Sequence, residues 1–206
     1  MLHDIAPLIG KAGCILAGGT ALALQMGHRI SEDFDFLTSK AFKTDRLLSE
    51  IRSFARSHQV LMEEDGALTC MINEIKVSFL KYDYPFLKSE TLPVGIRLAS
   101  VLDIAAMKVI AVSQRGSRRD FVDLYFILQT RPMHEIAAGM VKKFGVERLN
   151  PIHIGKGLVY FKDAESDPEP RYLQGRAVPW TVIRRFFEKH VKQFVLDLSR
   201  AREAEE

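Results

Sequence analysis

The pattern of apolar and polar positions changes near residue 100 of this 206-residue chain. In the first part, short runs in which apolar and polar residues alternate predict strands, because successive strand side chains point to opposite faces. In the second part, apolar residues recur every three or four positions, which is typical of amphipathic helices. We therefore predict an α+β fold, with a mixed sheet and flanking helices in residues 1–95 and a mainly helical lobe in residues 96–206.

The bounds of the elements follow from the same periodicity and from the turn residues between them. Strands are predicted at residues 14–17, 33–36, 59–63, 67–72 and 75–80. Helices are predicted at residues 2–12, 20–26, 44–57, 101–115, 118–129, 134–145, 152–161 and 181–202. Asp65-Gly66 and Asn73-Glu74 predict tight turns between strands. The segment 162–171 is acidic and contains two prolines, so it predicts a connecting loop.

A glycine-rich turn stands between the first predicted strand and the second predicted helix. It consists of Gly18, Gly19 and Thr20. Glycine lets backbone N–H groups approach a phosphate closely, and a helix N-terminus favours an anion. The hydroxyl of Thr20 is suited to cap the helix or to bind a phosphate oxygen. The turn is thus a candidate phosphate site, although an ordinary turn has the same composition.

Two carboxylates alternate with two phenylalanines shortly after this helix, in the order Asp33-Phe34-Asp35-Phe36. On a strand, Asp33 and Asp35 share one face while the phenylalanines enter the core from the other. Two like charges held about 7 Å apart repel each other unless a cation lies between them. Oxygen ligands of this kind favour Mg²⁺ or Mn²⁺. The alternative is a solvated acidic face.

Further polar candidates lie in the connection before the acidic strand and in the helical part. His28 and Arg29 are placed to touch a phosphate or to stabilise the Asp pair, and Ser31 to hydrogen-bond a carboxylate. Lys108 falls on or beside the apolar face of its predicted helix, where a lysine needs a partner or a water-exposed ammonium. Asp120 shares a helix face with the acid at position 123.

Composition and charge narrow the class of protein without naming a function. The chain is 47 % hydrophobic and 27 % charged, with a net charge of +3, as is ordinary for a soluble globular protein. No apolar run reaches the ~18 residues that span a bilayer, and the N-terminus does not have the form of a signal peptide. Cys14 and Cys70 lie apart in apolar runs, so we expect buried thiols and a cytoplasmic protein. Basic clusters in residues 97–131 and 184–192 suit a triphosphate or an RNA backbone, or are solvated helix faces.

Three ordered blocks of residues resemble a known family. Two glycines followed after about a dozen residues by Asp-x-Asp resemble the signature of the DNA polymerase β-like nucleotidyltransferase superfamily. The fuller string GGTAL…HRISEDFDFL resembles the AbiEii/AbiGii toxins, the toxin half of abortive-infection toxin–antitoxin pairs. Lys108 followed by Arg119-Asp120-x-x-Asp123-Leu124, and the string YFKDAE at residues 160–165 before two prolines, are similar to two later blocks of that family.

The resemblance implies a metal-dependent nucleotidyltransferase whose helical lobe completes the active-site cleft. It implies that Asp33 and Asp35 hold Mg²⁺ or Mn²⁺, and that Lys108 and Asp120 join them in catalysis, Asp120 as a base or as an orienter of Lys108 and Arg119. The residues that would bind the NTP are Gly18, Gly19, Thr20, Arg29, Ser31, Lys108 and Arg119. The implied acceptor is an RNA, such as the 3′ end of tRNA, or a protein hydroxyl. A cognate antitoxin protein is an implied partner, and a membrane is not.

One strand departs from the superfamily pattern and keeps two alternatives open. The superfamily often carries a third carboxylate on a later strand, where this chain has Ser78, and Asp83 lies past the expected strand end. The first alternative is a non-catalytic nucleotide- or RNA-binding module on the same fold. The second is a two-metal phosphodiesterase, which the Asp pair also allows.

Overall fold

The computed structural model describes residues 2–205 and divides into two compact units. Residues up to Leu24 together with Ser31–Ser100 form the first unit, and Gln25–Ile30 together with the chain from Val101 onward form the second. The sequence predicts one division of the chain, between residues 95 and 96. In the structure the second unit also includes residues 25–30, which come from the first part of the chain. The role of the two parts as halves of one cleft stays a prediction.

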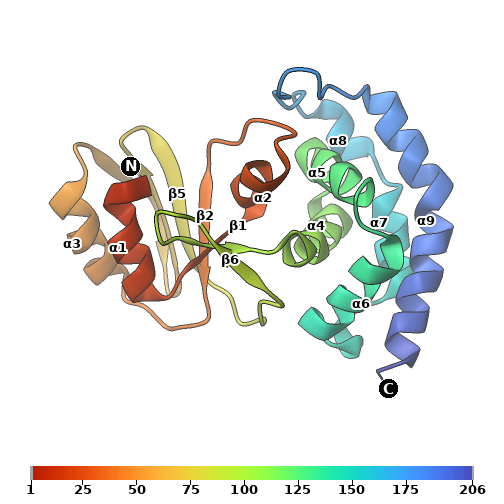
Figure 1. Cartoon of the computed structure of the whole chain (residues 1–206), viewed down its shortest axis with the longest axis horizontal. Helices are drawn as coiled ribbons and strands as arrows, with labels where there is room; N and C mark the ends of the chain where they lie inside the picture. The colour runs from red at the N-terminus through yellow and green to blue at the C-terminus, as the bar shows by residue number, and fades with distance from the viewer. Residues whose placement is uncertain (1, 206) are drawn as a thin grey trace. The chain divides into compact units, whose positions relative to one another are not determined.

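A seven-stranded mixed sheet forms the centre of the first unit (Figure 1). The strands are β1 (Ile15–Ala17), β2 (Phe34–Thr38), β3 (His58–Glu64), β4 (Ala67–Ile72), β5 (Ile75–Lys81), β6 (Ser89–Thr91) and β7 (Arg97–Ala99). Their order is β3-β4-β5-β2-β1-β7-β6. β2 pairs with β5 and β1 with β7 in parallel, and the other neighbours are antiparallel. The α+β fold predicted from the sequence is confirmed.

Three helices accompany the sheet. They are α1 (Leu2–Ala12), α2 (Gly18–Met26) and α3 (Thr44–Phe54). α1 and α3 lie side by side at one side of the sheet (Figure 1). The two predicted turns are confirmed, since Gly66 has φ +74° and Asn73 and Glu74 have φ 49° and 67°. Positive φ at both Asn73 and Glu74 matches a type I′ turn, and at Asp65-Gly66 the left-handed position is taken by the glycine.

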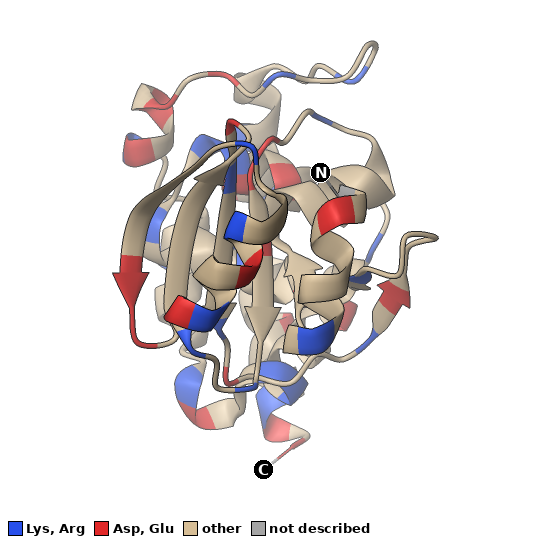
Figure 2. Cartoon of the chain, turned by 90° about the vertical axis from the view of Figure 1, so that its left-hand side faces the viewer, with Lys and Arg blue, Asp and Glu red and all other residues tan. Residues whose placement is uncertain are grey.

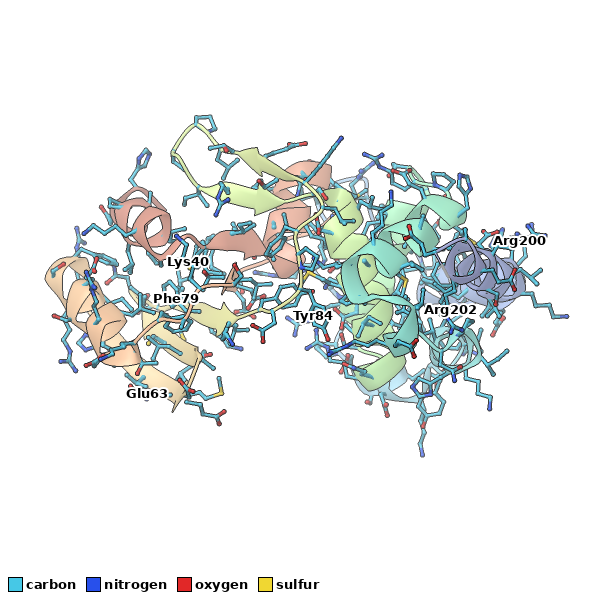
Figure 3. The ribbon with its side chains drawn as sticks, turned by 90° about the horizontal axis from the view of Figure 1, so that it is seen from below. Lys40, Glu63, Phe79, Tyr84, Arg200 and Arg202 are labelled. Carbon is cyan, nitrogen blue, oxygen red and sulfur yellow. The ribbon has the colours of Figure 1, made fainter. Side chains whose placement is uncertain are left out.

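One face of the central strands carries a row of large apolar side chains. Leu16, Phe36, Phe79 and Leu68 lie in register across β1, β2, β5 and β4, and all four are fully buried (Phe79 is labelled in Figure 3). The rings of Phe36 and Phe79 lie 5.6 Å apart and stack. Because side chains alternate, the neighbouring residue Asp35 points to the other face.

The second unit is helical. Its helices are α4 (Val101–Arg115), α5 (Arg118–Leu128), α6 (Met133–Phe144), α7 (Pro151–Leu158), α8 (Lys162–Ser166) and α9 (Trp180–Glu203), with a 3₁₀ turn at Val146–Arg148. Phe121 on α5 packs against Phe161, Trp180 and Phe187, with ring centroids 5.1–5.7 Å apart. These aromatic contacts join α5, α9 and the start of α8 into one core. Among residues 2–205, no helix is long and apolar enough to cross a bilayer.

Two sequence-based expectations about the fold were wrong or incomplete. Residues 162–166 form the helix α8 rather than a loop. Ala164 is fully buried there, and Arg118 donates to the carbonyl oxygens of Ala164 and Glu165, so tertiary contacts hold a segment whose composition favours a loop. The short strands β6 and β7 were not predicted, because three residues are too few to show alternation.

Candidate active site

The glycine turn of the first unit lies directly against one carboxylate of the Asp pair. β1 ends at Ala17 and α2 begins at Gly18, whose φ is +65°. A Cβ atom on Gly18 would stand 2.5 Å from Oδ2 of Asp35. Both the backbone angle and this close approach therefore require glycine at position 18. The N-terminus of α2 and the side chain of Asp35 occupy one small region of the unit.

Thr20 fixes the segment that leads into the acidic strand. Its buried hydroxyl donates to the carbonyl oxygen of Asp33 and lies 2.9 Å from the hydroxyl oxygen of Ser31. β1 ends at Ala17, which pairs with Asp35, and β2 begins at Phe34, which pairs with Val77 of β5, so Asp33 lies just outside the strand. In this structure Thr20 positions the Asp33 backbone. Contact of Thr20 or Ser31 with a phosphate stays a prediction.

The strand beside Asp35 carries a hydroxyl where a third carboxylate was considered. Ser78 on β5 pairs in register with Asp35 and is itself paired with Thr69 on β4, whose hydroxyl oxygen lies 3.3 Å away. The expected neighbouring strand is therefore present, with serine in place of an acid. Asp83 lies beyond β5 and forms an exposed ion pair with Lys81. Within the described part of the chain, no group of three acidic, His or Cys side chains could hold a metal ion.

The two carboxylates nevertheless suit one kind of cation. Asp33 and Asp35 are both half-buried rather than enclosed in the core. Mg²⁺ usually takes one or two protein carboxylates and completes its octahedron with water and substrate phosphates. The Asp35 carboxylate beside the N-terminus of α2, with Asp33 two residues earlier in the chain, is compatible with this requirement, whereas a structural metal site needs more protein ligands.

Replacement of Gly18 by alanine tests whether the close contact between position 18 and the Asp35 carboxylate is needed for stability and activity. We expect Gly18→Ala to lower the free energy of unfolding by about 1–2 kcal/mol, because the left-handed conformation is costly for a residue with a Cβ. We also expect nucleotidyl transfer to fall on the order of 10²-fold, since the Asp35 carboxylate must move. Gly10→Ala is the control, because Gly10 lies within α1 with nothing near its Cβ position. Equal effects of the two changes on activity would contradict the assignment.

A buried ion cluster forms in the second unit around Lys108. The ammonium nitrogen of Lys108 on α4 lies 2.6 Å from Oδ1 of Asp120 and 2.6 Å from Oδ2 of Asp123, both on α5. Burial by itself lowers the pKa of Lys108, but the two carboxylates outweigh it and raise the pKa above its usual value. Lys108 is thus a fixed cation. Its ammonium has three donors, of which these two contacts use two.

His28 and Arg29 contact Asp123, the second carboxylate of this cluster. Arg29 donates from Nε and Nη2 to the two oxygens of Asp123, at 2.6 and 2.9 Å, and Nε2 of His28 lies 2.8 Å from Asp123 Oδ1. The side chains of His28 and Asp123 are completely buried. Burial raises the pKa of Asp123, but Lys108, Arg29 and His28 together hold it far below the usual range. His28 and Arg29 therefore hydrogen-bond Asp123 in the second unit and stabilise its charged form.

Asp120 has a second set of partners that favours an orienting role over a basic one. Arg115 Nε lies 2.9 Å and the Ser117 hydroxyl 2.8 Å from its Oδ2. Burial raises the pKa of Asp120, but Lys108 and Arg115 outweigh it and lower the pKa below its usual value. A carboxyl group with a lowered pKa is a weak base at neutral pH. Arg119 is exposed, and the arginine that contacts Asp120 is Arg115.

Part of this cluster was visible in the sequence. The apolar surroundings of Lys108 indicated a need for a buried partner, and Asp120 and Asp123 shared a helix face. The contacts of Arg115 and Ser117 were missed. Ser117 also caps α5, where it accepts from the backbone N–H of Asp120, and a serine before an acidic first turn is a recognisable capping signal.

The cluster predicts how stability depends on pH. The pKa of Asp123 is lower in the folded state than the unfolded value of about 3.9, so its contribution is present above that value and is lost as the pH falls through the folded pKa. We expect the free energy of unfolding to decrease below about pH 4, and to decrease less in Asp123→Asn. Urea titrations between pH 2.5 and 7 measure this. Identical slopes for both proteins would contradict it.

The sequence of this chain is similar to a known family and to a protein of Aquifex aeolicus. A family model described as "Nucleotidyl transferase AbiEii toxin, Type IV TA system" matches residues 3–89 and 78–202. The protein aq_aa25 of Aquifex aeolicus (strain VF5), itself described as uncharacterized, is 35 % identical in an alignment of 190 positions that covers 87 % of this chain and 87 % of the relative.

Solved structures show the same fold at low sequence identity. The nucleotidyltransferase toxin MenT4 (Rv2826c) of Mycobacterium tuberculosis H37Rv aligns over 90 % of this chain and 75 % of its own, with a TM-score of 0.57 and 15 % identity. JHP933 of Helicobacter pylori aligns over 98 % and 90 %, with a TM-score of 0.55 and 17 % identity. These structures confirm the fold. The family match spans most of the chain and confirms the resemblance: this protein belongs to the AbiEii family of nucleotidyl transferase toxins and is a nucleotidyltransferase.

Proposed function

We propose that this protein transfers a nucleotide from an NTP to an acceptor hydroxyl with Mg²⁺ or Mn²⁺ at Asp33 and Asp35. The acceptor is an RNA, such as the 3′ end of tRNA, or a protein hydroxyl. The protein acts as the toxin of a toxin–antitoxin pair, so a cognate antitoxin is its partner. This proposal gives a substrate, a cofactor and a biological setting to the nucleotidyltransferase class.

The observation that carries the proposal is the packing of Gly18 against Asp35. The closeness of Oδ2 to the Gly18 position puts a helix N-terminus and the carboxylate proposed to bind the metal within one region. A helix N-terminus suits phosphate, and a carboxylate pair suits a cation that also binds phosphate. A nucleoside triphosphate with its divalent cation satisfies both at once.

The side chains have distinct tasks in this mechanism. A bound Mg²⁺ supplies charge neutralisation of the phosphates and lowers the pKa of the attacking hydroxyl. The backbone N–H groups of Gly18 and Gly19 are proposed to hold a phosphate at the start of α2. Thr20 keeps the Asp33 backbone in place through its hydroxyl.

The cluster of the second unit is proposed to bind the triphosphate. Lys108 has one donor beyond its two carboxylate contacts, and its side chain is 9 % exposed. Asp120 and Asp123 hold the ammonium in a fixed direction, which lowers the reorganisation needed during reaction. Arg119, which is exposed, is proposed as a further phosphate contact.

Incubation with each of the four α-³²P-labelled NTPs, Mg²⁺ or Mn²⁺ and total tRNA tests the proposal. We expect label on RNA or on protein together with released pyrophosphate, and loss of both with EDTA. Shortened RNA without label would instead support a phosphodiesterase. NTP binding in a thermal-shift assay without either product would support a non-catalytic module. Both of the last two outcomes would overturn the transferase proposal.

A further inference from the structure

A cavity of about 590 Å³ opens in the first unit beside α1 and α3, away from the candidate active-site residues. It is lined by Leu8, Lys11, Ala12, Lys40, Ala41, Phe42, Lys43, Arg46, Leu47, Glu50 and Asp65. Its volume lies within the range of about 300–1,000 Å³ that is common for small-ligand sites. We call it the α1–α3 cavity.

Cations outnumber carboxylates in the lining of the α1–α3 cavity. Its four basic residues are Lys11, Lys40, Lys43 and Arg46, and its two acidic residues are Glu50 and Asp65. Glu50 accepts a hydrogen bond from Lys11 at 3.5 Å and lies 3.8 Å from Nε of Arg46 in an ion pair, and both cations are largely exposed. Exposed pairs at these distances are weak. The net positive charge of the lining therefore remains available to an anionic ligand. Figure 2 shows the charged residues on the face where α1 and α3 lie.

Lys40 and Lys43 are the best-placed cations. Both are exposed, and no ion pair of either is found among the described residues. The stem of Lys40 lies over Gly13, because a Cβ on Gly13 would stand 3.2 Å from its Cε and Nζ. This packing holds Lys40 beside α1, and the residue is labelled in Figure 3.

The floor of the cavity is apolar and carries an aromatic ring. Leu8 on α1 and Leu47 on α3 are buried, and Phe42 is half-buried between Lys40 and Lys43 in the chain. An aromatic ring flanked by cations is the arrangement that binds single-stranded nucleic acid, because the ring stacks on a base while the cations neutralise phosphates. An acidic peptide would use the cations but would gain little from the ring.

We infer that the α1–α3 cavity binds a nucleotide unit of single-stranded RNA, with the base on Phe42 and the phosphates at Lys40 and Lys43. The inference rests on the proposed function, because the bound strand belongs to the acceptor. It names RNA, rather than a protein hydroxyl, as the acceptor class. It also assigns this cavity as a second contact for the acceptor, separate from the site of chemistry.

Fluorescence anisotropy with a labelled 12-nucleotide single-stranded RNA, without NTP or metal, tests the inference on the full chain. We expect Lys40→Glu/Lys43→Glu to weaken binding at least ten-fold and to reduce the slope of log affinity against log salt by about 1.4, since two phosphate contacts are lost. We expect Phe42→Ala to weaken binding about five-fold or more. Circular dichroism and the melting temperature check that the variants are folded.

Lys142→Glu/Lys156→Glu is the matched control, because it makes the same change in net charge at two exposed lysines of α6 and α7, outside both basic clusters. Equal loss of affinity in the two double variants, or unchanged binding by Phe42→Ala, would overturn the inference. The inference would also be overturned if oligo-glutamate displaced the bound RNA as effectively as unlabelled RNA does. The binding assay contains no NTP and measures no reaction. If it shows no RNA binding at this cavity, the proposed function is still tested independently by pyrophosphate release and labelling.

Discussion

Asp35→Asn is expected to lower the rate of nucleotidyl transfer on the order of 10²–10³-fold while the fold is retained. Asparagine has nearly the same shape as aspartate, so it fits between the neighbouring strands beside Ala17 and Ser78. The change removes the negative charge at the Gly18 turn and with it one of two proposed cation ligands. Single-turnover rates at saturating NTP and the melting temperature together measure the effect.

The control for this prediction is Asp83→Asn. Asp83 is also an aspartate of the first unit, but it lies beyond β5 in an exposed ion pair with Lys81. Its replacement is expected to leave the rate unchanged within about two-fold, since exposed pairs contribute little. Full activity of Asp35→Asn, or an equal loss in Asp83→Asn, would remove Asp35 from the metal site.

The second large effect is expected for Asp123→Ala, with a loss of about 3–5 kcal/mol in the free energy of unfolding. Asp123 accepts from Lys108, Arg29 and His28 and is completely buried. Its removal leaves buried cations without the carboxylate that compensates them, and their desolvation is no longer offset. Urea unfolding at pH 7 measures the loss.

The companion variants separate a general loss of charge from the loss of this cluster. Asp197→Ala on α9 removes a carboxylate that accepts an exposed hydrogen bond from Gln193, and it should cost less than about 0.5 kcal/mol. Asp123→Asn should fall between the two, because an amide oxygen can still accept hydrogen bonds. Similar losses for Asp123→Ala and Asp197→Ala would show that the cluster does not stabilise the second unit.

Much of the fold and part of the site follow from local sequence signals. The alternation Asp33-Phe34-Asp35-Phe36 predicts which side chains enter the core, and the row through Phe36 and Phe79 is buried as expected. Asp65-Gly66 and Asn73-Glu74 predict the turns. These features depend on residues that are close in the sequence, so strand or helix periodicity is enough to predict them.

Only the tertiary structure decided the partners of the buried charges and the neighbours of Asp35. Asp123 receives His28 and Arg29 from about 95 residues earlier in the chain, and Ala17 of β1 pairs in register with Asp35. The need for such partners is visible in the sequence, because a buried lysine such as Lys108 must be compensated. Their identity is not, because it depends on which distant segments meet when the apolar faces are buried. The sequence thus determined which groups require a partner, and tertiary packing determined which partner each one has.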